Sequence, residues 1–257
     1  MIQNSFIFLD NISKRKEILL WEQGITNWDR FLESDKIKGI SKSRKFFYDT
    51  QINRAKVALK EMNSTYFINK LPSDENWRLY DYFKDEACFL DIETTGVGPG
   101  SYITVIGMFD GYDTKTMIQG INLNIRELKK ELANYKLIVT FNGATFDLPF
   151  IKKRYPSLLP EIPNFDLKSA CAKINLNGGL KYIEKLLDIE RKNKIVSNLN
   201  GGDAVRLWRM YRASGNKHYL KLLIEYNEED CINLKQIADY AVKKLKQIYF
   251  SENYIYQ

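Results

Sequence analysis

The sequence has few of the residues that define several common classes of protein. Its three cysteines are far apart and without C-x-x-C spacing, so neither a disulfide framework nor a thiolate zinc site is indicated. We expect the cysteines to be small buried hydrophobes in a reducing compartment. The single histidine, His218, has no histidine partner and is expected to have a structural role.

Long hydrophobic runs are also missing. No apolar stretch approaches the roughly 20 residues that a membrane span needs. The N-terminal segment lacks the small-residue cleavage pattern of a secretory signal, and no internal repeat is visible. We therefore expect a cytoplasmic protein with no membrane partner.

What the chain does contain is typical of a soluble globular protein. It has 257 residues, of which 44% are hydrophobic and 28% charged, enough for one large domain or a main domain with a smaller attachment. Lys and Arg outnumber Asp and Glu by 39 to 32, giving a formal charge of +7. This charge favours approach to polyanions such as nucleic acid without identifying one.

The first part of the chain contains helical patterns only. Ser13 can cap a helix that runs to Gly24, and a second helix is expected to start behind Thr26. The run from Ser41 to Met62 predicts a longer helix with basic residues between its apolar ones. We therefore predict a small helical region over residues 1–75.

The pattern changes after LPSDEN, Leu71 to Asn76, whose proline and polar residues are typical of a linker. Apolar runs beyond it predict strands at 87–92, 102–109, 115–121, 137–141 and 164–167. Helical spacing predicts helices at 125–132, 180–187, 203–212 and 219–246. This order indicates an α/β fold with a mixed sheet flanked by helices over residues 86–246.

The strand within FLDIETTG ends in two acidic residues. Alternate side chains of a strand share a face, so Asp91 and Glu93 must project together, opposite Leu90 and Ile92. Two carboxylates beside a buried strand are costly unless a cation or hydrogen-bond donors compensate them. A strand end that frays into solvent would explain the same residues without any chemistry.

Two further acidic segments follow. Asp147 comes after the strand end at Asn142 and lies at an expected helix start, where a helix cap would be a sufficient role. In EYNEEDC, Tyr226 and Asp230 are four residues apart, so on a helix they occupy one face and can address a single site. Taken singly, Tyr226 is typical of a core and Asp230 of a surface.

In this order the three segments resemble the motifs of the DEDD superfamily of 3′-to-5′ exonucleases, whose catalytic domain has an RNase H-like fold. D-I-E-T-T-G resembles the first motif, N-x-x-x-F-D the second and Y-x-x-x-D the third. Tyr226, in place of a histidine five residues before Asp230, resembles the DEDDy branch, and the chain is similar to its YprB-like group. The resemblance covers roughly residues 86–246.

A site of this composition calls for metal ions. The four carboxylates, gathered in one pocket, would repel each other by about 3 kcal/mol per pair at ~5 Å and an effective dielectric of ~20. Two divalent cations, Mg²⁺ or Mn²⁺, suit such hard oxygen ligands and support in-line displacement at phosphorus. The expected metal ligands, which are also catalytic, are Asp91, Glu93, Asp147 and Asp230. Tyr226 is the fifth catalytic residue and either orients or deprotonates the attacking water.

Other residues are expected to contact the substrate. The resemblance places the turn of Thr94, Thr95 and Gly96 beside the scissile phosphate. The remaining candidates, Asn142, Phe146, Lys181 and the basic run ERKNK at 190–194, would contact sugar, base or phosphate. On general grounds a turn asparagine, a core phenylalanine and a solvated basic loop are the more common explanations of these residues. Asp203 is expected to cap a helix, and Asp166 is an additional carboxylate near the site.

The N-terminal region looks somewhat like helical-hairpin units that bind nucleic-acid backbone. In place of their glycine-containing hairpin it has Asp10-Asn11-Ile12-Ser13. The basic helix from Arg44 to Lys60 is a candidate for contact with a nucleic-acid chain, and a helical cap packed on the sheet is the alternative.

Three functions therefore remain open. The first is a metal-dependent 3′-to-5′ exonuclease that acts on 3′ ends of single-stranded DNA and releases nucleoside 5′-monophosphates, as the resemblance implies. The second is an RNA-directed or endonucleolytic nuclease of the same fold, and the third is a catalytically silent nucleic-acid-binding adaptor. Oligomeric state and any helicase or repair partner are undetermined by the sequence.

Overall fold

A five-stranded mixed sheet forms the centre of the protein. The computed structural model describes residues 1–250, and the strands occur in the order β3-β2-β1-β4-β5. They are β1 (Ala87–Thr94), β2 (Ile103–Phe109), β3 (Thr114–Ile118), β4 (Leu137–Thr140) and β5 (Asn164–Asp166). β2 runs antiparallel to both of its neighbours, β1 and β3, whereas β4 and β5 run parallel to β1. The mixed sheet indicated by the sequence is therefore present, with strand ends shifted by a few residues.

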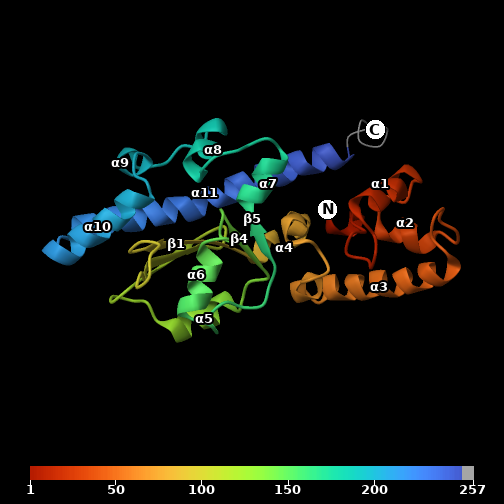
Figure 1. Ribbon diagram of the computed structural model, residues 1–257, viewed down its shortest axis with the longest axis horizontal. Coiled ribbons are helices and arrows are strands. Elements are labelled where there is room, and N and C mark those ends of the chain that lie inside the picture. Colours follow the sequence, from red (N-terminus) through yellow and green to blue (C-terminus); the bar gives the residue numbers. More distant parts are fainter. Residues whose placement is uncertain (251–257) are drawn as a thin grey trace.

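The central strand β1 has a different environment on each face. Cys88, Leu90 and Ile92 lie in one core cluster with α5 (Ile125–Leu132) and α6 (Asp147–Arg154). The opposite face, which carries Asp91 and Glu93, faces α11 (Lys217–Phe250). Figure 1 shows α11 crossing one face of the sheet, with α5 and α6 on the other. The two acidic residues of β1 are therefore on the α11 side, opposite Leu90 and Ile92, as predicted.

Close packing of α11 on the sheet requires a glycine in β2. A Cβ atom at Gly107 would lie 2.0 Å from Asn227 Oδ1 and 2.8 Å from Cys231 Sγ, closer than van der Waals contact allows. Gly107 is the partner of Asp91 in the β1–β2 register. The missing side chain thus lets α11 approach the strand at the level of the first acidic residue.

Four shorter helices lie between β5 and α11 in the chain. They are α7 (Leu167–Lys173), α8 (Leu180–Leu186), α9 (Lys194–Ser197) and α10 (Gly201–Ser214). α10 begins with Asn200 as its cap, and Asp203 lies three residues later in a capping box, so the prediction of Asp203 as the cap residue was wrong. Asn and Asp are both common cap residues. Because Asn200 and Asp203 are only three residues apart, the sequence alone did not show which of them caps the helix.

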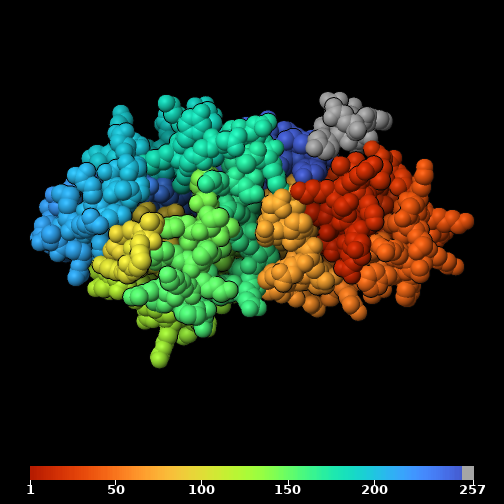
Figure 2. Space-filling model, in the orientation of Figure 1, coloured from red at the N-terminus to blue at the C-terminus, as the bar shows by residue number. Residues whose placement is uncertain are grey.

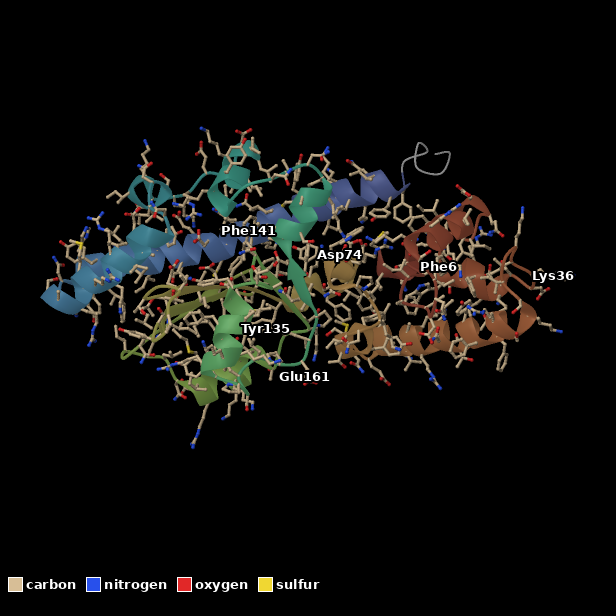
Figure 3. The ribbon with its side chains drawn as sticks, viewed as in Figure 1. Phe6, Lys36, Asp74, Tyr135, Phe141 and Glu161 are labelled. Carbon is tan, nitrogen blue, oxygen red and sulfur yellow. The ribbon has the colours of Figure 1, made fainter. Side chains whose placement is uncertain are left out.

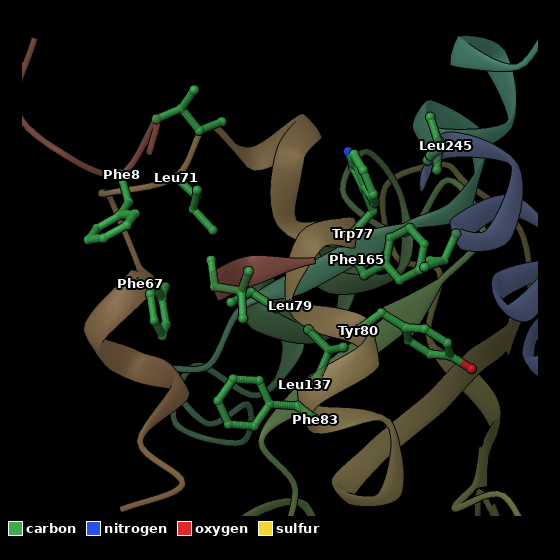
Figure 4. Packing of buried hydrophobic residues seen from close by; sticks show 14 of the residues in the cluster. Phe8, Phe67, Leu71, Trp77, Leu79, Tyr80, Phe83, Leu137, Phe165 and Leu245 are labelled. Atoms are coloured by element: carbon green, nitrogen blue, oxygen red, sulfur yellow. The ribbon is translucent and has the colours of Figure 1, made fainter. Parts of the chain in front are cut away.

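The N-terminal region is helical. Its α-helices are α1 (Lys14–Glu22), α2 (Trp28–Glu33), α3 (Lys42–Lys60) and α4 (Tyr80–Phe83), with 3₁₀ helices at Ile2–Asn4, Ser64–Phe67, Ser73–Leu79 and Lys84–Glu86. Ser13 caps α1 as expected, and Ser41 caps α3, whereas the cap of α2 is Asn27 and not Thr26. A single core cluster extends from these helices into the sheet. Figure 4 shows this packing, in which Phe8 and Phe67 lie on the N-terminal side and Leu137 and Phe165 on the sheet side.

The segment predicted as a linker is part of this packed junction. Ser73–Leu79 forms a 3₁₀ helix, and Glu75 and Arg78 are fully buried. Asp74, labelled in Figure 3, lies at the same junction and pairs with Lys14 and Lys173. The linker prediction was wrong because the charges of this segment have partners that are distant in the sequence.

Two expectations about composition can be compared with the structure. All three cysteines are free and buried. In the part of the chain that the structure describes, no helix combines the length and the hydropathy that crossing a bilayer would require.

Candidate active site

β1 brings Asp91 and Glu93 to the carboxyl end of the central strand. β4 pairs with β1 only as far as Phe89, so the edge of β1 beyond that residue is open on one side. Asp147, the first residue of α6, uses this opening: its Oδ1 accepts a hydrogen bond from the Ile92 amide at 3.1 Å. Its carboxylate is therefore bound to the residue between Asp91 and Glu93 and does not serve as a cap of its own helix.

α11 supplies the third acidic segment. Tyr226 and Asp230 lie on the buried side of this helix, one turn apart, as the spacing predicted. Between them, Asn227 donates a hydrogen bond from Nδ2 to Asp91 Oδ2 at 2.8 Å and so orients the first carboxylate. Sequence reasoning missed Asn227, although its position beside Tyr226 in a buried helix turn was a usable signal.

Residues from β1 and α11 converge on one point. Carboxylate oxygens of Asp91, Glu93 and Asp230 all lie within 4.8 Å of one another, and no other such group of three occurs among residues 1–250. Asp147 is not in this group, but it adjoins it through the Ile92 amide. Figure 2 shows a hollow in the surface between the yellow segment that follows β1 and the cyan segments around α8 and α9.

Burial and mutual repulsion disfavour the charged forms of these acids. Burial, followed by the charges of Asp230 and Asp147, raises the pKa of Asp91 and of Glu93 well above their ordinary values. Burial raises the pKa of Asp147 to about 7, although the Ile92 amide opposes the shift. Burial also raises the pKa of Asp230 to about 6, against the opposing charge of Arg191. These raised pKa values show that the positive charge around the four acids is too small to offset their burial and mutual repulsion.

The phenol of Tyr226 is held in its neutral form. Burial and then the charges of Asp230, Glu93 and Asp91 raise the pKa of this residue above its ordinary value. Its ring lies under the ammonium group of Lys181 at 4.9 Å and the guanidinium of Arg191 at 5.6 Å. A neutral hydroxyl suits hydrogen bonding to water better than removal of a proton from it.

Arg191 is the main departure from the sequence prediction at this site. Its side chain is only 2% exposed, and its Nη2 pairs with Asp230 Oδ1. It also donates two hydrogen bonds to Glu184 on α8, from Nε at 2.9 Å and from Nη2 at 2.7 Å. The prediction of a solvated basic loop was therefore wrong for this residue. Its two acidic partners are 7 and 39 residues away, so no local pattern marked it.

Glu184 is a further residue that sequence reasoning did not single out. It lies in α8, is buried, and accepts a hydrogen bond from Asn233 of α11 at 3.0 Å in addition to those from Arg191. Lys181, one turn earlier, donates to the backbone carbonyls of Val196 at 2.9 Å and Ser197 at 3.1 Å. Both residues thus fasten the 188–200 segment over α11.

The predicted substrate-contacting turn follows β1 directly. Thr94 Oγ1 donates to the Gly96 carbonyl at 2.9 Å, and Thr95 Oγ1 accepts from the Tyr102 amide at 3.1 Å. Gly96 has φ of 142°, a conformation that residues with a side chain rarely adopt. The turn is therefore closely tied to the end of β1, beside Glu93.

The residues predicted around the second motif have mainly internal partners. Asn142 has a φ of 63°, donates its backbone amide to Asp166 at 2.9 Å, and accepts from Lys168 at 3.2 Å. Phe146 packs on Phe150 with their ring centroids 5.7 Å apart. Asp166 caps α7, and Asn142 lines a cavity of about 860 Å³ between the sheet and the N-terminal region.

Comparison with known proteins identifies the family. A family model of the RNase H superfamily matches residues 88–242, more than half of the chain, and this protein belongs to that superfamily. The match contains β1, Asp147 and the Tyr226–Asp230 segment, and it confirms the predicted RNase H-like α/β fold. No curated protein and no solved structure matches the chain.

Membership in this superfamily agrees with the chemistry of the cluster. It suggests a nuclease that binds nucleic acid and uses divalent metal ions. Asp91, Glu93 and Asp230 offer only oxygen donors, which suits a hard cation such as Mg²⁺ or Mn²⁺. The residues present therefore fit a metal-dependent hydrolase.

Proposed function

We propose that this protein is a divalent-metal-dependent 3′-to-5′ exonuclease that acts on single-stranded DNA ends and releases nucleoside 5′-monophosphates. The observation that carries the proposal is the convergence of Asp91, Glu93 and Asp230 within 4.8 Å, with Asp147 hydrogen-bonded to the strand between the first two. The direction of cleavage and the DEDDy, YprB-like assignment rest on the resemblance of the three motifs.

In this proposal the four carboxylates hold two divalent ions. When bound there, such ions would supply an activated water and charge stabilisation for the departing 3′ oxygen in phosphodiester hydrolysis. Asn227 keeps the carboxylate of Asp91 in position, and the Ile92 amide does the same for Asp147. Tyr226 orients the attacking water through its neutral hydroxyl, because its pKa is raised by burial.

The substrate end would lie against the turn that follows β1. Thr94, Thr95 and Gly96 are beside Glu93 in the chain, and Phe146 immediately precedes Asp147. In the proposed complex these residues and Asn142 contact the terminal nucleotide, while Lys181 contributes positive charge beside Tyr226.

One observation favours a second candidate function. Arg191 pairs with Asp230 and supplies part of the positive charge that metal ions would otherwise provide. A nucleic-acid-binding adaptor with a catalytically silent site is the function that this ion pair favours. The two candidates make opposite predictions about metal-dependent cleavage.

A cleavage assay separates these candidates. Single-stranded DNA and RNA labelled at the 5′ end would be incubated with the protein and Mg²⁺, Mn²⁺ or EDTA, and the products separated by length. Metal-dependent stepwise loss from the 3′ end supports the exonuclease, internal fragments indicate an endonuclease, and binding without cleavage indicates the adaptor. Faster cleavage of RNA would reverse the proposed substrate preference.

Variants connect the activity to the site. Asp91→Ala and Asp230→Ala should each reduce cleavage by at least about a thousandfold, because each removes a metal ligand. Glu127→Gln, an exposed carboxylate on α5, is the matched control and should cleave normally. Circular dichroism would verify folding, and near-native turnover by either alanine variant would refute the assignment.

A further inference from the structure

A second pocket lies at the end of the sheet where β1 and β3 end and β2 begins. It has a volume of about 370 Å³ and is lined by Tyr102, Gln119, Gly120, Arg154, Trp208 and Arg212. Arg154 ends α6 and Arg212 lies on α10, and these two helices pack in clusters on opposite faces of the sheet. The two arginines therefore line one pocket from helices on opposite faces of the sheet.

The pocket has positive charge without a counter-ion. Two guanidinium groups line it and no carboxylate does. Both arginines are exposed, and within residues 1–250 neither side chain has a hydrogen bond or an ion pair. Other arginines near the sheet are paired, as Arg191 is with Glu184 and Asp230. An anion is the ligand that such a pair of free guanidinium groups recognises best.

The base of the pocket offers neutral hydrogen-bonding groups. Trp208 is 2% exposed and donates from Nε1 to the Tyr102 hydroxyl at 3.2 Å. Because this hydroxyl accepts from Trp208, its own proton remains available to an acceptor in the pocket. The ring of half-buried Tyr102 also offers an apolar surface beside the arginines. Proteins that bind single-stranded nucleic acid typically combine positive charge, which binds the phosphates, with aromatic rings, which stack on the bases.

The pocket is directly connected to the candidate active site. Tyr102 donates its amide to Thr95 Oγ1 at 3.1 Å, and the Thr95 amide donates to the Tyr102 carbonyl at 3.0 Å. Thr95 lies two residues after Glu93, so one short turn joins the acidic cluster to the pocket. A nucleic-acid strand whose end lies in the acidic cluster would pass this turn.

We propose that this pocket is a subsite for the substrate strand, in which Arg154 and Arg212 bind a backbone phosphate and Tyr102 contacts the adjoining sugar or base. The inference rests on the proposed function for the identity of the ligand as single-stranded nucleic acid. It does not depend on catalysis, because the pocket contains none of the acidic residues.

The test measures binding apart from cleavage. Fluorescence anisotropy of a labelled single-stranded oligonucleotide in EDTA would compare wild type with Arg154→Ala, Arg212→Ala and the double variant over a range of salt concentrations. Each single variant should bind about tenfold more weakly, because it removes one of the two guanidinium groups that donate to the phosphate. The double variant should also reduce the slope of log affinity against log salt by about 0.7, because one phosphate contact is lost.

Matched controls separate the pocket from general surface charge. Arg209→Ala removes an exposed arginine of the same helix that does not line the pocket, and it should change affinity little. Tyr102→Phe keeps the ring and removes the hydroxyl, so it should weaken binding less than either arginine variant. Arg154→Lys and Arg212→Lys should recover part of the affinity, because charge is restored without the bidentate geometry.

Several outcomes would overturn the proposal. One is a double variant that binds the oligonucleotide as wild type does, and another is an equal loss of affinity in Arg209→Ala. If millimolar inorganic phosphate or a 5′-mononucleotide bound in an arginine-dependent way while the arginine variants bound the oligonucleotide as wild type does, the pocket would be a site for free phosphate. Failure of the cleavage assay with arginine-dependent binding intact would contradict only the exonuclease function, so the two failures are distinguishable.

Discussion

Two buried groups of charged residues in this protein have opposite electrostatic character. At the junction between the N-terminal region and the sheet, Arg78 pairs with Glu17 at 2.8 Å and with Glu75 at 2.7 Å. Lys14 and Lys173 also pair with Glu75. Burial opposes ionisation of Glu75, but these cations outweigh it and hold its pKa below the ordinary value.

At the candidate active site the balance is reversed. Asp91, Glu93, Asp147 and Asp230 have raised pKa values, and Arg191 is the cation that pairs directly with one of them. Buried charge that is fully paired fixes the position of two parts of a fold, whereas buried charge that lacks partners marks a place for a ligand. The following predictions test this difference.

The largest expected effect on stability is at the junction. Arg78→Met would remove the buried guanidinium that pairs with Glu17 and Glu75. Because two buried carboxylates would lose this partner, the free energy of unfolding should fall by about 3–5 kcal/mol. Urea denaturation would measure it, with Arg15→Met, an exposed arginine of α1, as the control. Equal stability of Arg78→Met and the control would show that the junction does not depend on this ion pair.

Divalent metal should have the next largest effect. At a concentration a hundredfold above its dissociation constant, Mg²⁺ or Mn²⁺ should raise the free energy of unfolding by about 2.7 kcal/mol, since it binds only the folded cluster. Asp91→Asn should remove this increase, whereas Glu127→Gln should retain it. An unchanged increase in Asp91→Asn, measured by thermal unfolding, would place the metal elsewhere.

The pH dependence of the metal-free protein should reflect the unpaired acids. The pKa values of Asp147 and Asp230 are about 7 and about 6 in the folded state, above their ordinary value. The folded protein therefore holds more protons than the unfolded chain between about pH 4 and pH 7. Stability should fall as pH rises through this window, by about 2 kcal/mol between pH 5.5 and 6.5.

Unfolding in EDTA at several pH values would measure this trend. Asp147→Asn should have a smaller pH dependence, because asparagine does not titrate. Glu127→Gln, whose carboxylate is exposed, should behave as wild type does. A wild-type protein that gains stability over this range would contradict the raised pKa values.

The sequence predicted those features that depend on local pattern. Alternation in β1 placed Asp91 and Glu93 on one face, and the four-residue spacing of Tyr226 and Asp230 placed them one helix turn apart. Helix caps were ambiguous where two polar residues are adjacent, as at Thr26 and Asn27. In these places the local signal was correct to within one residue.

Features that depend on distant partners were not predictable in the same way. Glu75 and Arg78 are in a polar segment that is typical of a linker, but Glu17 is 61 residues from Arg78 in sequence. Arg191 likewise needs both Glu184 and Asp230 to become buried. A charge pattern alone does not reveal which charged residue acquires such partners, because the fold determines which residues meet.

The smallest predicted effect concerns the one cation that pairs with the acidic cluster. Arg191 Nη2 contacts the carboxylate of Asp230, which is also one of the three candidate metal ligands, so arginine and metal compete for it. Arg191→Met should therefore bind Mn²⁺ about tenfold more tightly in a calorimetric titration, which corresponds to about 1.4 kcal/mol. Lys192→Met, an exposed neighbour, removes the same charge without the contact and should leave the affinity unchanged. Equal Mn²⁺ affinity in Arg191→Met and wild type would mean that the arginine does not compete with metal. Weaker binding in the arginine variant would mean that Arg191 holds Asp230 in the position that the metal requires.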